Sequence, residues 1–371
     1  MQQETTALQR SHEITVKSMT IKSLLLTYFK NHQSASFQFG NGINCILGKN
    51  GKGKTNLLDA VYYLSFTKSG VGCQDRLAVT HHASAFTIYG KYESQTIAIQ
   101  FQKGRAKSLK IDGKEPERLS DVIGKVPLVM VLPDDTGMIN EGSDERRKFF
   151  DGAISQFDQA YLQWLLNYKK LLKQRNSLLK QEGGCLDFQL LAAYDDQLIP
   201  LARRISERRR ALKEIFLPFL QKNYRELHEG KEVPDLNFKT QITEEFESLF
   251  KANVRRDQAV QRTLLGSHQD DFEFLLNGEP IKHFGSQGQQ KTFIIALKLA
   301  TYDFLREQTQ KKPLLLLDDI FDKLDESRIQ LLAALLVNRE RFGQIFITDA
   351  HQDRSKSLFE GERDIKFINI V

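Results

Sequence analysis

The segment Gly48–Thr55, with the sequence GKNGKGKT, decides the fold. It matches GxxxxGK[ST], the pattern of a phosphate-binding loop, and stands between the apolar run INCIL (43–47) and the amphipathic stretch TNLLDAVYYLSF (55–66). A strand, a glycine-rich turn and a helix in this order gather backbone N–H groups and the positive end of a helix dipole around one point. We therefore predict a nucleoside triphosphate site, where Lys54 reaches the β- and γ-phosphates and Thr55 ligates Mg²⁺.

This loop supplies most of the predicted nucleotide contacts. The alternative is a lysine-rich turn without a ligand, and the strand before it and the helix after it argue against that alternative. The predicted contacts are Gly48, Lys49, Asn50, Gly51, Lys52, Gly53, Lys54, Thr55 and Asn56.

A second segment, PLLLLDDIFDKLD (313–325), supplies the acidic groups. Four leucines followed by two aspartates indicate a strand that is buried on both faces and ends in a polar cleft, where parallel α/β sheets bind their ligands. We predict that Asp318 holds Mg²⁺ and that Asp319 positions or deprotonates the attacking water. Taken alone, the segment also fits a strand followed by an Asp-capped turn.

A third segment, GSQGQQKT (285–292), opens a helix that continues through IIALKLA. A Ser-x-Gly helix start is ordinary capping by itself. Its place before the double aspartate resembles the order of motifs in ATP-binding-cassette ATPases. In that superfamily the serine-glycine signature of one subunit closes over the γ-phosphate bound by another. The resemblance implies ATP and Mg²⁺ as cofactors, an ATP-dependent homodimer, and the signature residues Ser286, Gln287, Gly288 and Gln289.

The chain is organised as a split α/β unit with a helical insertion. Lys54 and Gly288 stand 234 positions apart, and an inserted lobe accounts for this separation, as in chromosome-handling relatives rather than transporters. The fold class that we predict is α/β, an ABC-type ATPase head with mixed sheets plus an inserted all-helical lobe. We expect residues 1–18 to be a disordered extension, residues 19–142 and 229–371 to form the head, and residues 143–228 to form the lobe.

The surplus positive charge is concentrated in the predicted lobe. The chain carries a formal charge of +6 and a pI near 9.0, and the lobe holds 16 Lys and Arg against 11 Asp and Glu. Basic residues three or four positions apart share a helix face and can follow a phosphate backbone. A solvated helix face is the better reading of any single stripe. The DNA-binding candidates are Lys169, Lys170, Lys173, Arg204 and Arg208.

Composition excludes several other classes of protein. No apolar run approaches the ~20 residues that cross a bilayer, and the start of the chain does not have the apolar stretch of a secretory leader. The three cysteines are scattered, without the spacing of a zinc site. We therefore expect a cytoplasmic protein with no membrane partner, disulfide framework or structural metal.

Five segments in order resemble the RecF family of DNA repair proteins. They are the N-terminal block LLLTYFKNHQSASFQFGNGINCILGKNGKGKTNLLDAVYYLSFTKS, the lobe segment DERRKFFDGAISQFDQAYLQWLLNYKKLLKQRNSLLK, and GSHQDDFEF, SQGQQKTFIIALKLA and LLLLDDIFDKLD. The resemblance implies a bacterial recombination mediator of the cytoplasm and nucleoid. Such a protein dimerises on DNA when it binds ATP, and it hydrolyses the ATP slowly. It implies action with RecO and RecR to load RecA at single-strand gaps and stalled forks.

The resemblance also adds residues to the predicted site. Lys30 and Asn31 occupy the place of the family's Arg-Asn pair as nucleotide contacts, and Asp325 lies in the loop that crosses the dimer interface. Two departures concern arginines: Lys30 replaces one, and Gln269 replaces the one in the family's GPHRDD segment. Asp319 is one methylene shorter than the usual glutamate, so we expect a turnover below about 1 per second. The role of His351, which follows the strand QIFIT, stays open.

Three rival functions follow from parts of the same pattern. A transporter-type cassette would need a membrane-coupling surface and no basic lobe. A nuclease-associated cassette would need an additional acidic domain, but only 46 residues follow Asp325. A small-molecule kinase would leave the serine-glycine segment unexplained.

Overall fold

The computed structural model describes residues 17–181, 187–228 and 230–370. The strands are β1 (Lys17–Ser18), β2 (Ile21–Phe29), β3 (His32–Gln38), β4 (Ile43–Leu47), β5 (Ala85–Tyr92), β6 (Thr96–Gln102), β7 (Ser108–Ile111), β8 (Leu128–Val131), β9 (Pro234–Lys239), β10 (Asp271–Leu276), β11 (Glu279–Pro280), β12 (Lys311–Lys312), β13 (Leu314–Leu317), β14 (Ile345–Asp349) and β15 (Ile365–Asn369). The helices are α1 (Lys54–Phe66), α2 (Gly137–Asn140), α3 (Ser143–Ser155), α4 (Gln159–Leu179), α5 (Phe188–Leu227), α6 (Phe246–Ala252), α7 (Val254–Val260), α8 (Ile281–Phe284), α9 (Gln287–Thr309), α10 (Glu326–Leu336) and α11 (Gln352–Leu358).

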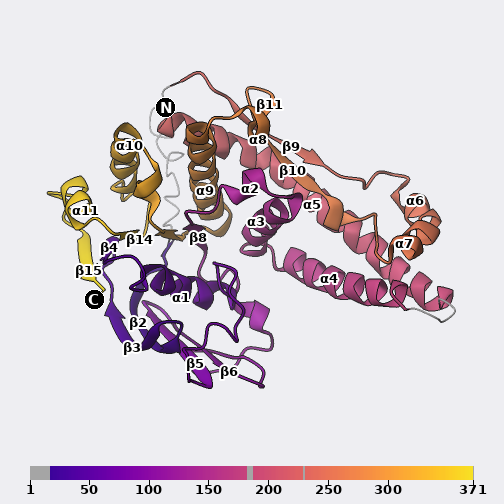
Figure 1. Ribbon diagram of the computed structural model, residues 1–371, viewed down its shortest axis with the longest axis horizontal. Coiled ribbons are helices and arrows are strands. Elements are labelled where there is room, and N and C mark those ends of the chain that lie inside the picture. The colour runs from indigo at the N-terminus through magenta and orange to yellow at the C-terminus, as the bar shows by residue number, and fades with distance from the viewer. Residues whose placement is uncertain (1–16, 182–186, 229, 371) are drawn as a thin grey trace, which may run out of the picture.

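A parallel sheet with the strand order β15-β4-β14-β13-β8 forms the centre of the head. Helix α1 covers one face, and α9 and α10 cover the other (Figure 1). Alternate residues of β13 serve the two faces: Leu314 and Leu316 pack in the core with α1, whereas Leu315 and Leu317 pack in the core with α9 and α10. The strand is thus buried on both faces, as the run of leucines predicts.

A second sheet, antiparallel with the order β3-β2-β5-β6-β7, packs on the far side of α1. Leu57 and Leu64 of α1 share its core with Ile88 of β5 and Ile97 of β6. Because α1 lies between the two sheets, the turn before it is held from both sides. The two sheets and their helices give the mixed α/β head that the sequence predicts.

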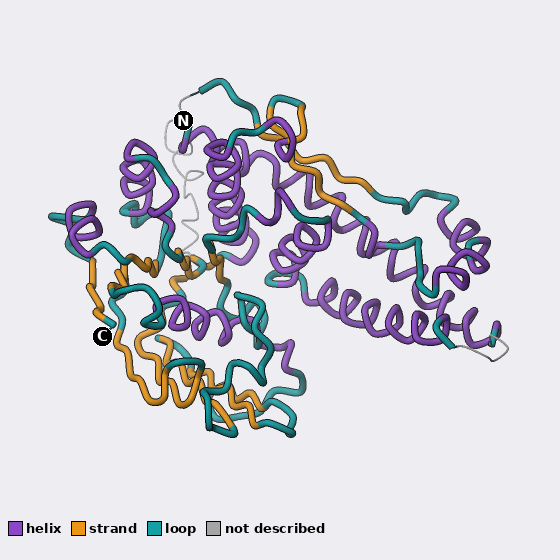
Figure 2. Tube along the Cα trace, in the orientation of Figure 1, coloured by secondary structure: helices purple, strands orange, loops and turns teal. Residues whose placement is uncertain are grey.

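The helical region projects from the head as an arm (Figure 1). Helix α5, with 40 residues, packs along α4, and the far end of the arm consists of helices without strands (Figure 2). Helices α6 and α7 come from the chain after residue 228, which the sequence assigns to the head, yet they pack on the arm. Their contacts include an ion pair between Asp257 of α7 and Arg175 of α4. The polypeptide therefore returns to the arm before it completes the head.

The N-terminal prediction is corrected in part. Residues 1–16 lie outside the described residues. Residues 17 and 18 do not belong to a disordered extension, because they form β1, which pairs in parallel with β12. None of the helices among the described residues has both the length and the apolar composition needed to cross a lipid bilayer.

Candidate nucleotide-binding site

The turn between β4 and α1 has the conformation of a phosphate loop. Gly51 and Gly53 have φ angles of 81° and 101°, in the left-handed region that favours glycine. A Cβ atom at Gly53 would also lie 2.5 Å from the side-chain amide of Asn31. Helix α1 begins at Lys54, and the free N–H groups of its first turn face the loop. Both the backbone angles and the close packing therefore require glycine here.

Lys54 lies folded over this loop. Its ammonium group donates to the carbonyl of Gly48 at 2.9 Å and to the side-chain oxygen of Asn50 at 3.1 Å, and it is 3.9 Å from the carboxylate of Asp319. The side chain is buried. A buried cation held mainly by neutral oxygens within the loop can exchange these contacts for phosphate oxygens, which form stronger charge-assisted bonds.

Thr55 and Asp318, 263 positions apart, meet across the site. The Thr55 hydroxyl lies 2.8 and 3.0 Å from the two carboxylate oxygens of Asp318, and the Thr348 hydroxyl donates to Asp318 at 2.8 Å. Burial raises the pKa of Asp318, opposed by the hydrogen bonds from Thr348 and Thr55. Hydroxyl and carboxylate oxygens are the hard donors that Mg²⁺ prefers, so the predicted pair fits this ion.

Asp319 adopts a constrained backbone conformation beside Asp318. Its φ angle is 42°, and its N–H donates to the Thr348 hydroxyl at 2.8 Å. Burial raises the pKa of its carboxyl group, opposed by the charge of Lys54. Thr348 thus contacts both acids, a role that the sequence does not reveal because it depends on β14 lying next to β13. His351 is exposed, and its backbone N–H donates to Asp349 at 2.8 Å.

The turn after β2 packs against the phosphate loop, but Lys30 has an unexpected partner. Its ammonium group lies 2.7 Å from the carboxylate of Asp59, which is fully buried in α1 and also accepts from the Ser69 hydroxyl and the Gly70 N–H. Asn31 accepts from the Asn56 amide at 2.8 Å. The charge of Lys30 is therefore compensated within the chain. Sequence reasoning missed Asp59, an acid within an otherwise apolar stretch of α1.

The serine-glycine signature caps helix α9. The Ser286 hydroxyl accepts from the Gln289 N–H at 3.2 Å, and the Gln289 side chain accepts from the Ser286 N–H at 2.7 Å, which forms a capping box. The Gln289 amide also donates to Glu232 at 2.7 Å. Among the described residues, no hydrogen bond or ion pair joins residues 286–289 to residues 48–55. The two halves of the predicted site do not contact each other.

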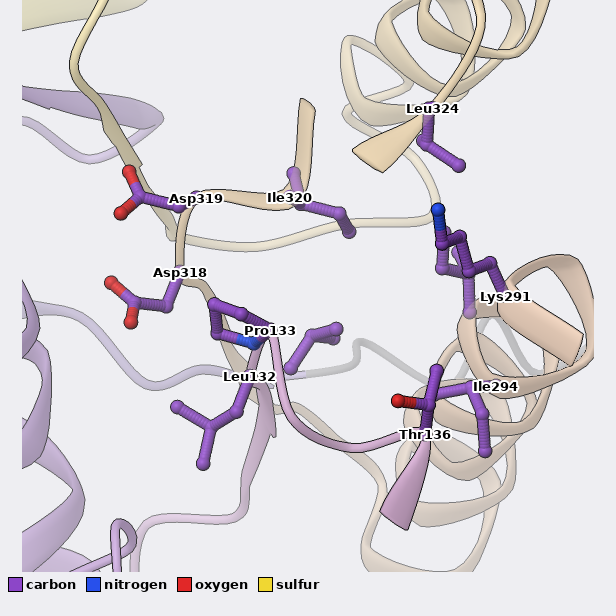
Figure 3. A pocket seen from close by; sticks show the side chains of 11 residues that line it. Leu132, Pro133, Thr136, Lys291, Ile294, Asp318, Asp319, Ile320 and Leu324 are labelled. Atoms are coloured by element: carbon purple, nitrogen blue, oxygen red, sulfur yellow. The ribbon is translucent and has the colours of Figure 1, made fainter. Parts of the chain in front are cut away.

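An apolar pocket separates the two acids from helix α9. In Figure 3, Asp318 and Asp319 lie on one side, and Lys291 and Ile294 lie on the other. Leu324, from the predicted interface loop, closes the upper edge of this pocket (Figure 3). The predicted interface loop thus borders the same pocket as Asp318, Asp319 and helix α9.

The predicted interface loop ends where α10 begins. Asp325 is the N-cap of α10 and accepts from the Arg328 backbone N–H at 3.0 Å and the Arg328 guanidinium at 2.9 Å. A hydrogen bond from the Ser327 hydroxyl lowers the pKa of Asp325, together with the bonds from Arg328. The loop is therefore held in a defined conformation, with the Asp325 side chain at the surface.

The basic residues of the arm fall into two groups. The exposed group contains Lys169, Lys170 and Lys173 on α4, together with Arg204 and Arg208 on α5. Arg204 stacks over Trp164 at 5.6 Å, and Arg208 forms an ion pair with Asp158 at 2.8 Å.

The second group of cations is buried. Arg175 pairs with Asp195 and Asp257, and Arg209 pairs with Asp151 and Asp270. These two arginines stabilise the arm and its junction with the head and are unavailable to a polyanion. Two of the 16 Lys and Arg that the sequence places in the lobe are therefore not available at its surface.

Comparisons with known proteins agree with this architecture. The profile of the RecF/RecN/SMC N-terminal domain matches residues 20–360. The DNA replication and repair protein RecF of Cytophaga hutchinsonii is 42% identical over 348 residues, which cover 92% of each chain. The RecF protein of Flavobacterium johnsoniae is 41% identical over 92% of this chain and 96% of its own.

Solved structures give the same result. A structure described as the recombination mediator protein RecF with ATP in the RecFOR pathway superposes with a TM-score of 0.84 at 30% identity, over 92% of this chain and 94% of its own. The Smc head of Pyrococcus furiosus, at 16% identity and a TM-score of 0.54 over 95% of this chain and 94% of its own, shares the fold alone. The extent of these matches shows that the chain belongs to the RecF family.

Proposed function

We propose that this chain is an ATP-dependent DNA-binding protein of recombinational repair, in which ATP joins two copies into a dimer on DNA. One observation carries the proposal: the phosphate loop and the signature are both well formed, yet they do not contact each other within one chain. Two copies related by a two-fold axis complete both sites at once, because each phosphate loop meets the partner's signature. The solved RecF relative described with ATP supports nucleotide binding.

The residues around the phosphates have distinct roles. The loop N–H groups and Lys54 bind the β- and γ-phosphates, while Thr55 and Asp318 hold Mg²⁺, which when bound neutralises phosphate charge. Asp319 accepts a proton from the attacking water or orients it. Its left-handed backbone and its bond to Thr348 fix the carboxylate on a short side chain. Slow hydrolysis follows, because a short side chain has little freedom to reach the water.

The arm provides the proposed DNA contacts. Lys169, Lys170 and Lys173 are exposed on one stretch of α4, and Arg204 and Arg208 add charge on α5. Dimerisation brings two arms to one assembly, so contacts that are weak in one copy act together. Phosphate contacts carry no sequence information, so binding is independent of sequence. From its membership of the RecF family, we further propose that the protein acts with RecO and RecR to load RecA at gaps and stalled forks. This action would take place in the bacterial cytoplasm and nucleoid.

Sedimentation with ATP, Mg²⁺ and duplex DNA tests the proposal. We expect wild type to form a DNA-bound dimer and Lys54→Arg to stay monomeric. The combined change of Lys169, Lys170 and Lys173 to alanine should retain the ATP-dependent dimer but weaken DNA binding, with a smaller dependence of affinity on salt. A wild-type protein that stays monomeric with ATP, or binds DNA equally with and without ATP and at every salt concentration, would contradict the proposal.

A further inference from the structure

Phe284 is an aromatic side chain in an unusual position. It is 70% exposed, the largest exposed fraction of any large hydrophobic side chain among the described residues. It ends the short helix α8, two residues before Ser286, the N-cap of the signature helix. The two preceding residues, Lys282 and His283, are also exposed. The exposed phenyl ring therefore lies immediately beside the half of the ATP site that has no partner within the chain.

The backbone around Phe284 is firmly held. The Gly285 N–H donates to the carbonyl of Ile281 at 3.0 Å, and Ile281 is buried. The Gln290 amide donates to the carbonyls of Ile281 and Gly285 at 3.3 and 3.2 Å. A Cβ atom at Gly285 would lie 2.7 Å from the Ile281 carbonyl oxygen, so the turn closes only with glycine. A rigid backbone that presents an aromatic ring to solvent is typical of a preorganised interface residue.

Two exposed apolar side chains lie on neighbouring segments beside the other half of the site. Leu77 is 67% exposed and Tyr28 is 47% exposed. The segments that carry them run side by side, because the Lys30 N–H donates to the Ala78 carbonyl at 2.7 Å and the Thr80 N–H donates to the Tyr28 carbonyl at 2.9 Å. The turn that follows Tyr28 carries Asn31, which contacts the phosphate loop. We call Tyr28 and Leu77 the receiving patch.

We propose that Phe284 binds the receiving patch of a second copy of this chain when ATP joins the two copies. This inference rests on the proposed function, because it places the ring in the same dimer. The two-fold axis that sets a signature against a partner's phosphate loop also sets the residue beside the signature against the residues beside that loop. Phe284 is two residues from Ser286, and Tyr28 is three residues from Asn31, which packs against the phosphate loop, so the proposed interface adjoins both halves of the site. The contact forms twice in each dimer, and it excludes water from the edge of the nucleotide.

The test is the dimer dissociation constant, measured by sedimentation equilibrium of the full chain with a non-hydrolysable ATP analogue and Mg²⁺. The variants are Phe284→Ala, Phe284→Trp and Leu77→Ala. The matched control is Phe188→Ala, which removes another exposed phenylalanine, 57% exposed, from the arm. Binding of a fluorescent ATP analogue, at protein concentrations far below that constant, shows whether each variant retains the nucleotide site. Thermal unfolding shows whether each variant is folded.

We expect Phe284→Ala and Leu77→Ala to weaken dimerisation at least about tenfold, while Phe284→Trp and Phe188→Ala behave as wild type and every variant binds nucleotide normally. Dimerisation of Phe284→Ala at wild-type strength would overturn the inference and leave the proposed function intact. Dimerisation of Leu77→Ala at wild-type strength would overturn the receiving patch. A wild-type protein that does not dimerise with the analogue would overturn both the inference and the proposed function.

Discussion

Replacing Arg175 by methionine should destabilise the arm without harming the nucleotide site. Arg175 is fully buried, donates to Asp195 at 2.6 Å and to Asp257 at 2.7 Å, and stacks over Phe250 at 4.9 Å. Methionine fills a similar volume but leaves two buried carboxylates without a cation. Breaking a buried ion pair in this way costs about 3–5 kcal/mol. Because both acids lie in the arm, we expect the loss there.

Urea unfolding and amide hydrogen exchange measure this effect. The arm amides of Arg175→Met should exchange faster, the free energy of unfolding should fall by about 3–5 kcal/mol, and the affinity for ATP should not change. Lys173→Met, an exposed change on the same helix, is the control for stability and should cost less than about 0.5 kcal/mol. Adding Asp195→Asn and Asp257→Asn should restore part of the loss. A loss below 1 kcal/mol, or an equal loss of ATP affinity, would refute the reasoning.

Three further changes test other contacts. Thr348→Val removes an acceptor from the Asp319 N–H and a donor from Asp318, so stability should fall by about 1–3 kcal/mol and the ATPase rate should fall more than ATP affinity in parallel assays. Asp59→Asn leaves the partly buried Lys30 without its buried anion, so urea unfolding should show a loss of up to about 3–5 kcal/mol, partly recovered by adding Lys30→Met. Burial lowers the pKa of His268, so this histidine takes up a proton more readily in the unfolded chain than in the folded chain. The free energy of unfolding should therefore fall as the pH drops from 7 through about 6.5. His268→Gln should reduce that slope, and an unchanged slope would count against this explanation.

Sequence patterns predict the centre of the head well, because one residue type there satisfies one physical demand. The apolar run 43–47 matches the bounds of β4, and the four leucines 314–317 match those of β13. Four leucines in a row favour a position between two layers, and the glycines of GKNGKGKT favour a tight turn. These signals are local, so composition and spacing reveal them without knowledge of the neighbours.

Contacts between distant segments could not be predicted in the same way. Thr348 contacts Asp318 because β14 lies beside β13, and the sequence of neither strand specifies this strand order. The family resemblance predicts Lys30 as a nucleotide contact, but in the structure its ammonium group lies beside Asp59 of α1. Arg209 follows the DNA-binding candidate Arg208 in the sequence, but in the structure it is buried between Asp151 and Asp270. In each case a partner far away in sequence decides the role of the residue.

Mixing two inactive variants tests the central claim, a site shared between copies, most directly. Lys54→Ala inactivates the phosphate loop and Ser286→Arg inactivates the signature, so neither variant alone has an intact site if each site is composite. A mixed dimer has one intact site, made from the phosphate loop of the Ser286→Arg copy and the signature of the Lys54→Ala copy. The ATPase rate of the mixture should rise well above the summed rates of the two variants alone, because only the mixed pair holds ATP in an intact composite site. A mixture as inactive as either variant alone would contradict the account.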